Sequence, residues 1–322
     1  MIAHILQTAG LAPSFAIGGE LPPDGAPARL GAPPWLVVEA DESDGTLALY
    51  APFLAVVTNI EFDHADHFPD LSAFRRCFQT FAAQATSLLA CADDPEAASL
   101  ASTLPAARTW TLASVLPTAD PSPAGWTYRL PGRPETFTLP LPGRHNLSNA
   151  LGAIAAAEAA GVPPPTAAAA LRTFRLPKRR LDRVTTPSGV TVVADYAHHP
   201  TEIRALLSAV RQLYPTSRLL YAFQPHRYTR TRLLGPQFPA AFQDAAAGVL
   251  LPVYPASEPY DPAGSSETLA AHFPPASRPE LLPDLPTAAA RLAALARPTD
   301  VILVVGAGSI EHLVPLLLPL LA

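Results

Sequence analysis

The stretch GVTVVADYAHHPTEIRALLSAVRQL, residues 189–213, decides the fold class because an apolar run, a polar loop and a helical pattern follow one another in it. The apolar run is rich in β-branched residues and is typical of a buried strand. Pro200 suits the first turn of a helix. Three more apolar runs in the second half, RLLYA, GVLLPV and VILVV, are each followed by a loop. This alternation predicts an α/β fold with β-α-β units and a mainly parallel sheet.

The first half of the chain contains two short apolar strands that end directly in carboxylates and histidines. They are WLVVEADESD, residues 35–44, and LAVVTNIEFDHADH, residues 54–67. Apolar residues at helical spacing predict helices at residues 2–9, 71–81 and 146–160. The partial alternation of TYRLPGRPETFTL around a Pro-Gly turn predicts a β-hairpin. We therefore predict two α/β domains, residues 1–175 and residues 176–322.

The composition is that of a globular protein and excludes several classes. The 322 residues are 49% hydrophobic and 15% charged, and the net charge of −5 offers no general attraction to nucleic acid or to acidic membranes. Cys77 and Cys91 do not make a disulfide framework. The N-terminus lacks the basic segment of a signal peptide, and the apolar C-terminal run is too short to span a bilayer. We expect a cytoplasmic protein without membrane insertion; the sequence does not address its oligomeric state.

Polar clusters follow the predicted strands at five places, and ligands of parallel α/β sheets bind beyond the carboxyl ends of the strands. The stretch EADESD places Glu39 and three further carboxylates within six residues. It is either an acidic surface loop or a source of oxygen ligands for a hard cation such as Mg²⁺. His64 and its acidic neighbours follow the next strand, with a spacing that matches no zinc signature. We expect a ligand site built from these strand ends.

Candidate nucleotide contacts lie at three further positions. Asn146 is a candidate N-cap of the alanine-rich helix, a role that does not exclude a contact to a nucleotide at the helix start. Arg180, in the run KRR, is either surface charge or a bidentate partner for phosphate. Asp195 ends a strand, where carboxylates commonly hold a ribose hydroxyl. His198 and His199 follow it; one is a candidate general base, and one can instead cap the next helix.

These stretches together resemble the Mur ligases over essentially the whole chain. The stretches that carry the resemblance, in order, are EADESDG, VTNIEFDHAD, LPGRHNLSNALGAIAAA, KRRLD, VVADYAHHPTEI, FQPHRYTRTR and VVGAGSI. The resemblance implies a central ATPase-type domain followed by a Rossmann-like C-terminal ligase domain. It also implies an ATP- and Mg²⁺-dependent amide ligase of cell-wall synthesis. Within the family, FQPHRYTRT favours the members that join L-alanine to UDP-N-acetylmuramate over those that recycle murein tripeptide, which have a Glu-Pro-Arg-Ser pattern there.

The resemblance also implies roles for single residues. Glu39 and His64 resemble the Mg²⁺ ligands, and Asn146, Arg180 and Asp195 resemble the ATP contacts, the last of them to ribose. Three residues resemble those that face the muramyl carboxylate and the incoming amino acid: His198, Arg227 and Arg230. Fixed cations at this place suit a reaction that builds up negative charge.

The chain departs from the family pattern at its start. The family's UDP-sugar-binding domain and its Gly-Thr-x-Gly-Lys-Thr phosphate-binding loop do not occur in the sequence, whose only lysine is Lys178. We expect a truncated or misstarted ligase that binds ATP poorly and lacks turnover. The alternatives are a tripeptide-recycling ligase and a non-catalytic fragment that binds a nucleotide or a partner. Loss of the first strand would leave a sheet gap, so we expect residues 1–175 to be less stable than residues 176–322.

Overall fold

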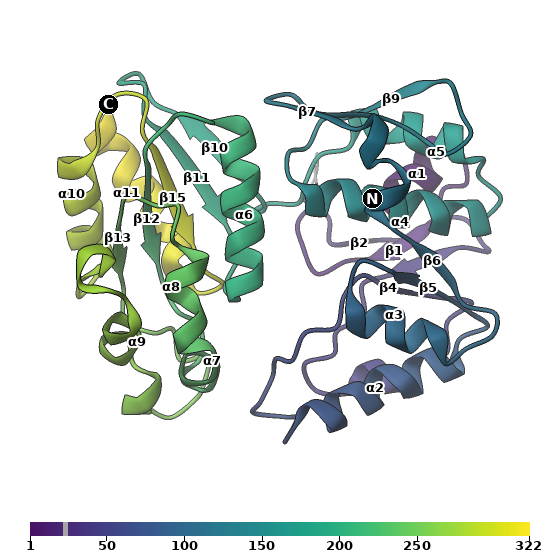
Figure 1. Ribbon diagram of the computed structural model, residues 1–322, viewed down its shortest axis with the longest axis horizontal. Helices are drawn as coiled ribbons and strands as arrows, with labels where there is room; N and C mark the ends of the chain where they lie inside the picture. The colour runs from purple at the N-terminus through teal and green to yellow at the C-terminus, as the bar shows by residue number, and fades with distance from the viewer. Residues whose placement is uncertain (22–24) are drawn as a thin grey trace. The chain divides into compact units, whose positions relative to one another are not determined.

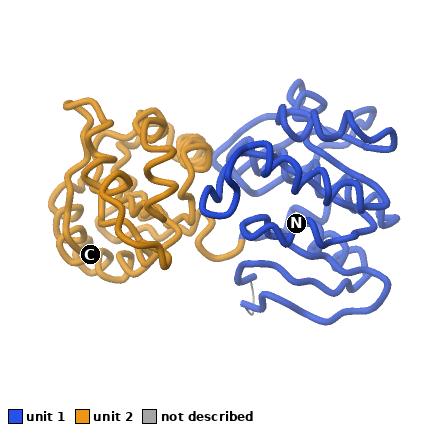
Figure 2. Tube along the Cα trace, turned by 90° about the horizontal axis from the view of Figure 1, so that it is seen from below, with its two compact units in different colours: residues 1–176 blue, residues 177–322 orange. Residues whose placement is uncertain are grey.

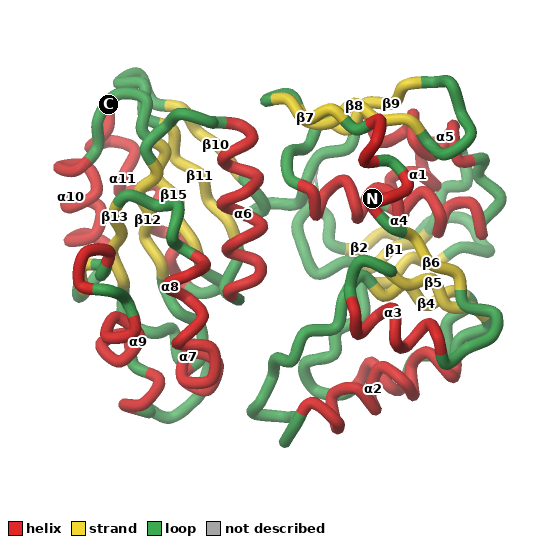
Figure 3. The backbone as a smooth tube through the Cα atoms, in the orientation of Figure 1, coloured by secondary structure: helices red, strands yellow, loops and turns green. Residues whose placement is uncertain are grey.

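The structure is a computed structural model that describes residues 1–21 and 25–322. It divides into two compact units, residues 1–176 and residues 177–322 (Figure 2). Within the described residues, no helix combines the length and the apolar character needed to cross a bilayer. Both units are mixed α/β structures (Figure 3).

Among the residues that the structure describes, the first unit contains three small sheets, each of three strands. One sheet has the order β2-β1-β3, in which β1 (Ser14–Ala16) pairs antiparallel with β2 (Ala28–Arg29) and parallel with β3 (Leu36–Val38). A second, wholly parallel sheet contains β4 (Leu54–Val57), β5 (Ser87–Cys91) and β6 (Arg108–Trp110). The third is antiparallel and contains β7 (Asp120–Ser122), β8 (Gly125–Arg129) and β9 (Thr136–Leu139). The β8–β9 pair confirms the predicted hairpin.

Helices cover both faces of the parallel strands in the first unit (Figure 1). On one face lie α2 (Leu71–Gln84) and α3 (Pro95–Ser102), with the short 3₁₀ helix η1 (Thr46–Leu49) beside α2. On the other lie α1 (Ile2–Thr8), α4 (Arg144–Ala159) and α5 (Pro164–Ala170). The three helices predicted for this half are therefore confirmed. Short 3₁₀ turns complete the unit: η2 (Leu112–Ser114), η3 (Leu116–Thr118) and η4 (Leu171–Thr173).

The strands of the first unit separate two hydrophobic cores because side chains alternate across a strand. In β4, Leu54 and Val56 pack into the core of α1 and α4, whereas Ala55 and Val57 pack into the core of α2 and α3. Both faces of these strands are therefore apolar, as expected for a parallel sheet between helices. The aromatic stripe of α2 is buried in its core, which is why this helix follows the predicted three- and four-residue spacing.

The second unit is built on one six-stranded sheet with the order β10-β11-β15-β12-β13-β14. The four central strands, β11 (Thr191–Asp195), β15 (Val301–Val305), β12 (Leu219–Phe223) and β13 (Ala247–Leu250), are mutually parallel and correspond to the four predicted runs. Strand β14 (Glu280–Leu281) continues the parallel order at one edge, and β10 (Asp182–Thr185) joins antiparallel at the other. The mainly parallel sheet is thus confirmed.

Helices pack on both faces of this sheet (Figure 1). One face carries α6 (Pro200–Leu213), α7 (Tyr228–Leu234), α8 (Phe238–Ala241) and α9 (Ser266–His272). The other carries α10 (Leu285–Leu295) and α11 (Leu313–Leu317). The chain ends in a 3₁₀ turn, η9 (Leu318–Leu321), so the apolar C-terminal run packs onto the sheet, with Leu313, Leu317 and Leu321 buried.

Candidate functional site

The loop after β12 begins with a strained turn, which carries the side chains of His226 and Arg227 and leads into the helix that carries Arg230. Arg227 has φ +69°, a left-handed conformation that non-glycine residues rarely adopt. Its main-chain N–H donates to the Tyr254 carbonyl (2.8 Å), and the Tyr254 N–H donates to the Pro225 carbonyl (2.8 Å). The His226 ring stacks on the Tyr254 ring with centroids 5.5 Å apart. Helix α7 then starts at Tyr228, so Arg230 lies in its first turn.

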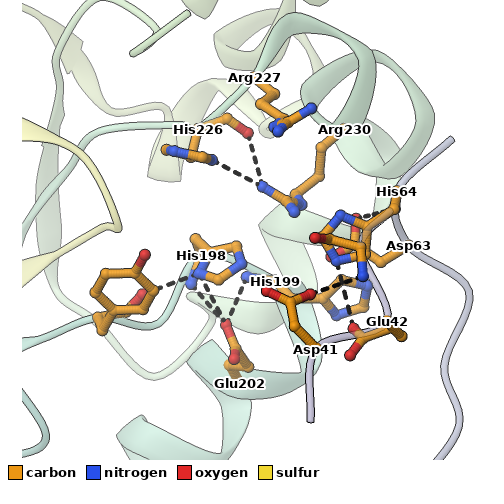
Figure 4. Close-up of polar contacts among 12 residues, drawn as sticks. Asp41, Glu42, Asp63, His64, His198, His199, Glu202, His226, Arg227 and Arg230 are labelled. Carbon is orange, nitrogen blue, oxygen red and sulfur yellow. Dashed lines mark hydrogen bonds and ion pairs between the residues drawn. The ribbon is translucent and has the colours of Figure 1, made fainter. Parts of the chain in front are cut away.

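Arg230 is held by His226 (Figure 4). Its Nη1 donates to His226 Nδ1 (3.0 Å) and to the His226 carbonyl (3.1 Å), and its side chain is only 5% exposed. A guanidinium is always protonated and only donates, so Nδ1 of His226 must be unprotonated here. His226 is therefore neutral and carries its proton on Nε2. Arg227 lies 3.9 Å from Glu258, measured from Nη1 to Oε1, and is half-buried.

His198 and His199 have different roles at the start of α6. His199 is the N-cap, because its Nδ1 accepts from the Thr201 N–H (3.3 Å). Glu202 completes a capping box by accepting the N–H groups of His198 (2.9 Å) and His199 (3.1 Å). His198 Nδ1 lies 3.0 Å from the Tyr196 carbonyl, which only accepts, so this nitrogen carries a proton. The prediction that one of the two histidines caps the helix is confirmed. In His198, the other histidine, Nε2 is the nitrogen that can accept a proton.

The surroundings of Glu202 favour its charged form. Burial alone would raise the pKa of this carboxyl. The His198 ring, 3.4 Å away between Nδ1 and Oε2, and the two N–H donors oppose that effect and hold the pKa below its ordinary value. The His198 and His226 rings lie with their centroids 5.8 Å apart. The ends of β11 and β12 thus bring His198 and the His226–Arg230 pair to one side of this unit (Figure 4).

Asp195 and Arg180 lie at the same end of the sheet. Asp195 accepts the N–H groups of Leu181 (2.8 Å) and Ala197 (2.9 Å), one on each oxygen. Burial raises the pKa of its carboxyl, against the opposing effect of those bonds and of Arg180. Arg180 is exposed, and its guanidinium lies 5.3 Å from the centroid of the Tyr196 ring. An exposed guanidinium beside a strand-end carboxylate is an arrangement that suits a nucleotide phosphate and ribose.

The Gly-Ala-Gly turn after β15 has a packing reason. A Cβ added at Gly308 would lie 2.5 Å from Cγ of Tyr254 and 2.7 Å from Oε1 of Gln224. Gln224 Oε1 also accepts the Ile310 N–H (3.0 Å), which ties this turn to the loop after β12. Arg179 donates to the carbonyls of Gly306 (2.8 Å) and Gly308 (3.1 Å). The turn therefore supports the loop that carries His226.

In the first unit, the predicted metal ligands follow β3 and β4. Glu39 comes directly after β3, is exposed, and its Oε2 accepts the Gly18 N–H (3.1 Å). His64 has φ +54°, and its Nε2 lies 3.4 Å from Glu42 Oε1 and 4.0 Å from Asp63 Oδ2. Within residues 1–21 and 25–322, no three or more histidine, cysteine or carboxylate side chains converge into a metal site. Mg²⁺ usually takes one or two protein carboxylates, with phosphates and waters as its other ligands, so this acidic end still suits it.

The structure corrects the interpretation of Asn146 as a helix cap. Helix α4 starts at Arg144, with Gly143 as the N-cap at φ +88°, a conformation that favours glycine. Asn146 lies inside the first turn, is 4% exposed, and donates from Nδ2 to the Pro142 carbonyl (2.7 Å). Its role as a nucleotide contact remains a prediction.

Sequence reasoning missed several residues that support this site. Glu202 was detectable, because a carboxylate three residues after a helix N-cap is the signature of a capping box. Tyr254 and Glu258 lie in a separate loop after β13, and no local pattern connects them to His226 or Arg227.

Comparison with known proteins identifies the family. The Mur ligase middle domain model matches residues 35–157, and the Mur ligase glutamate ligase domain model matches residues 179–308. A UDP-N-acetylmuramate–L-alanine ligase of Kineococcus radiotolerans is 41% identical over 100% of this chain and 71% of its own length. The chain belongs to the Mur ligase family. The same enzyme from Mycolicibacterium smegmatis is 40% identical over 97% of this chain and 68% of its own length.

Solved structures of Mur ligases share the fold. MurC from Thermotoga maritima, a UDP-N-acetylmuramate-alanine ligase, has a TM-score of 0.77 at 24% identity and covers 99% of this chain and 71% of its own. MurF from the same organism, solved in complex with ADP, has a TM-score of 0.74 at 15% identity over 99% of this chain and 76% of its own. Mur ligases form amide bonds with the use of ATP. The resemblance and the α/β fold deduced from the sequence are confirmed.

Proposed function

We propose that this chain serves the ligation of L-alanine to UDP-N-acetylmuramate at the expense of ATP, a step of peptidoglycan synthesis in the cytoplasm. The observation that carries the proposal is the identity of 39–41% to enzymes of that name over 98–100% of the chain. The cationic and imidazole groups at the ends of β11 and β12 supply a suitable chemistry. Their roles are argued below from their contacts.

The reaction divides into two transfers that balance in atoms and charge. A carboxylate oxygen of the muramyl group attacks the γ-phosphorus of ATP, and ADP leaves to give an acyl phosphate. The amine of L-alanine then attacks the acyl carbon, the amide bond forms, and inorganic phosphate leaves with that carboxylate oxygen. Both steps concentrate negative charge on oxygen atoms, and fixed cations stabilise such charge most strongly where water is excluded. We assign this role to Arg227 and Arg230.

His198 is the candidate general base for the amine. L-alanine in solution carries an ammonium group, which has to lose a proton before nitrogen can attack. With its Nδ1–H directed at the Tyr196 carbonyl, His198 presents Nε2 as the proton acceptor. Glu202, held in its charged form, stabilises the imidazolium that results. His226 acts differently, because its neutral ring orients Arg230.

We assign ATP contacts to Asn146, Arg180 and Asp195, and Mg²⁺ ligation to Glu39 and His64. Arg180 supplies a guanidinium for phosphate, and Asp195 a carboxylate for ribose. When bound, Mg²⁺ neutralises charge on the phosphates. Glu39 and the His64–Glu42–Asp63 group provide oxygen and imidazole donors at the ends of β3 and β4.

Product analysis at stoichiometric enzyme tests the proposal. The sequence contains a single lysine, Lys178, which lies outside any phosphate-binding motif. Because steady-state turnover is not expected of this chain, the test looks for product under single-turnover conditions. The chain is incubated with ATP, Mg²⁺, UDP-N-acetylmuramate and either L-alanine, D-alanine or murein tripeptide, and products are identified by mass spectrometry. We expect UDP-N-acetylmuramoyl-L-alanine as the main product.

Two other outcomes would assign a different function. Product with the tripeptide alone would indicate the recycling ligase, whose solved relative from Psychrobacter arcticus shares the fold with a TM-score of 0.71. Binding of ATP in calorimetry without any product would indicate a non-catalytic nucleotide-binding protein. The control variant is Arg204→Met. Arg204 is exposed on α6 and donates a hydrogen bond to Thr201, so its replacement should not change the products.

A further inference from the structure

The β13 loop, residues 254–261, packs against the loop that carries Arg227. Tyr254, its first residue, forms an isolated parallel bridge with His226, and their rings stack with centroids 5.5 Å apart. The Tyr254 carbonyl accepts the Arg227 N–H (2.8 Å). The carbonyl of Arg227 accepts both the N–H (3.2 Å) and the hydroxyl (2.7 Å) of Thr231. The main chain of Arg227 is therefore fixed at both its donor and its acceptor.

Glu258, in the same β13 loop, reaches the start of α7 and the side chain of Arg227. Its Oε2 accepts the Thr229 N–H (3.0 Å), and its Oε1 accepts the Thr229 hydroxyl (2.5 Å). Oε1 also lies 3.9 Å from Nη1 of Arg227. Arg227 is the N-cap residue of α7 and makes no side-chain cap of its own, so the carboxylate of Glu258 supplies the cap from a separate loop.

Burial strengthens the attraction between this carboxylate and the guanidinium. The side chain of Glu258 is 11% exposed, and that of Arg227 is 26% exposed. Opposite charges at this separation attract weakly in water and several times more strongly where water is partly excluded. A guanidinium presents its N–H donors as one rigid planar fork, so an attraction at Nη1 fixes the direction of the whole group.

Backbone strain is concentrated where the two loops meet. Arg227 has φ +69°. Ala256 and Ser257, which lead to Glu258, have φ +46° and +72°, and the Glu258 N–H closes their turn by donating to the Pro255 carbonyl (2.9 Å). Two positive φ values in succession are typical of type I′ turns, which favour Gly, Asn and Asp. Other residues keep such a conformation only where their surroundings hold it, and this kind of strain clusters at functional sites.

We propose that Glu258 is a positioning residue for Arg227, in addition to its role as the cap of α7. By attracting one side of the guanidinium, its carboxylate keeps the fork in one orientation before the transfers begin. The inference rests on the proposed function, in which Arg227 stabilises negative charge on oxygen atoms. A cation that is already fixed stabilises developing charge without reorganisation, whereas a mobile side chain must first be ordered. Glu258 therefore acts on the rate through Arg227.

Two substitutions separate positioning from capping. In Glu258→Gln, the side-chain carbonyl can accept the Thr229 N–H and the amide can donate to the Thr229 hydroxyl, so the cap remains while the negative charge is lost. Glu258→Ala removes the cap and the charge together. The matched control is Glu280→Gln, because Glu280 is an exposed ion-pair partner of Arg291 on the edge strand β14.

The first measurement follows Arg227 itself and needs no turnover. NMR of the whole chain with ¹⁵N-labelled arginine gives the rate at which the two Nη atoms exchange by rotation about the Nε–Cζ bond. The Arg227→Lys variant assigns the signal by its loss. We expect rotation at least about 5-fold faster in Glu258→Gln than in the parent, and within about 1.5-fold of the parent in Glu280→Gln.

The second measurement is the single-turnover rate of amide formation with L-alanine. At saturating substrates, Glu258→Gln should lower this rate about 10- to 100-fold, because a misplaced group at the reacting centre costs up to about 100-fold. The ATP concentration that gives half of the maximal rate should stay within about 3-fold of the parent, since Arg227 acts on charge that develops during the transfers. Circular dichroism confirms that each variant folds.

Two results would overturn the inference. An equal rotation rate in Glu258→Gln and in the parent would show that the carboxylate does not hold the guanidinium. A parent-like rate of amide formation in Glu258→Gln, together with a slow one in Glu258→Ala, would show that Glu258 only caps α7. Because rotation is measured without substrates, it decides the inference even where the parent forms no amide. Failure of the proposed function and failure of this inference are therefore distinguishable.

Discussion

Replacing Arg230 by methionine should separate catalysis from stability. In the native protein, one guanidinium nitrogen makes two hydrogen bonds to His226, of 3.0 and 3.1 Å, within a side chain that is 5% exposed. Hydrogen bonds to a charged group contribute about 1.5–3 kcal/mol to stability. Burying the charge, however, costs several kcal/mol, and apolar replacements of buried charges are often neutral. We therefore expect the free energy of unfolding to change by less than about 1.5 kcal/mol.

The effect on catalysis should be much larger. Loss of one fixed donor to a developing oxyanion costs about 2.7–4 kcal/mol, or 10²–10³ in rate. The assay is the single-turnover rate of amide formation with L-alanine, and urea unfolding is followed in parallel. Arg204→Met, at an exposed position of α6, removes the same charge and should keep the parent rate within about 2-fold. Two results would refute this reasoning. One is a decrease of more than about 3 kcal/mol in the free energy of unfolding of Arg230→Met, and the other is a single-turnover rate that this substitution leaves unchanged.

Three further predictions concern stability. Because the pKa of Glu202 is lowered in the folded protein, the ionised side chain stabilises the fold at pH values above the ordinary pKa of 4.5. This stabilisation is lost as the pH falls through the folded-state pKa. Glu202→Gln should lower the free energy of unfolding by about 1 kcal/mol at pH 7 and should make stability less dependent on pH in the acid range. Thermal melts whose pH dependence is the same as that of the parent protein would contradict this. Asp300, 4% exposed, accepts from Arg218 Nε (3.1 Å) and Nη2 (2.6 Å), so Asp300→Asn should lower the free energy of urea unfolding by about 2–3 kcal/mol. A loss under about 0.5 kcal/mol would show that the pair is not stabilising. Finally, residues 1–175 should exchange amide hydrogens faster than residues 176–322, and equally slow exchange in both would refute the expected weakness of the first unit.

Much of the fold was predictable because its buried strands are apolar runs. The four central strands of the second unit are apolar in their interiors, and the polar residues Thr191 and Asp195 stand at the two ends of β11. Strand β10, by contrast, is exposed at all four residues, and β14 has only two residues. Edge strands of this kind have no hydrophobic signature, since their position is fixed by the partner strand.

The candidate site was predictable only in part. The identity of its residues followed from polar clusters at strand ends, but their pairing did not. His226 and Arg230 are four residues apart, yet His226 precedes the helix and Arg227 has φ +69°, so helical spacing does not describe the contact. Gly143 capped α4 in place of Asn146 because a left-handed φ at that position suits glycine.

An oxygen-transfer experiment tests the central claim, ATP-dependent amide formation through an acyl phosphate, most directly. UDP-N-acetylmuramate with ¹⁸O in both carboxylate oxygens is incubated with the chain, ATP, Mg²⁺ and L-alanine, and the released phosphate is analysed by mass spectrometry. Because phosphate leaves with a carboxylate oxygen, the account predicts one ¹⁸O atom per phosphate, in equal amount to the amide formed. Unlabelled phosphate accompanying amide formation would contradict it.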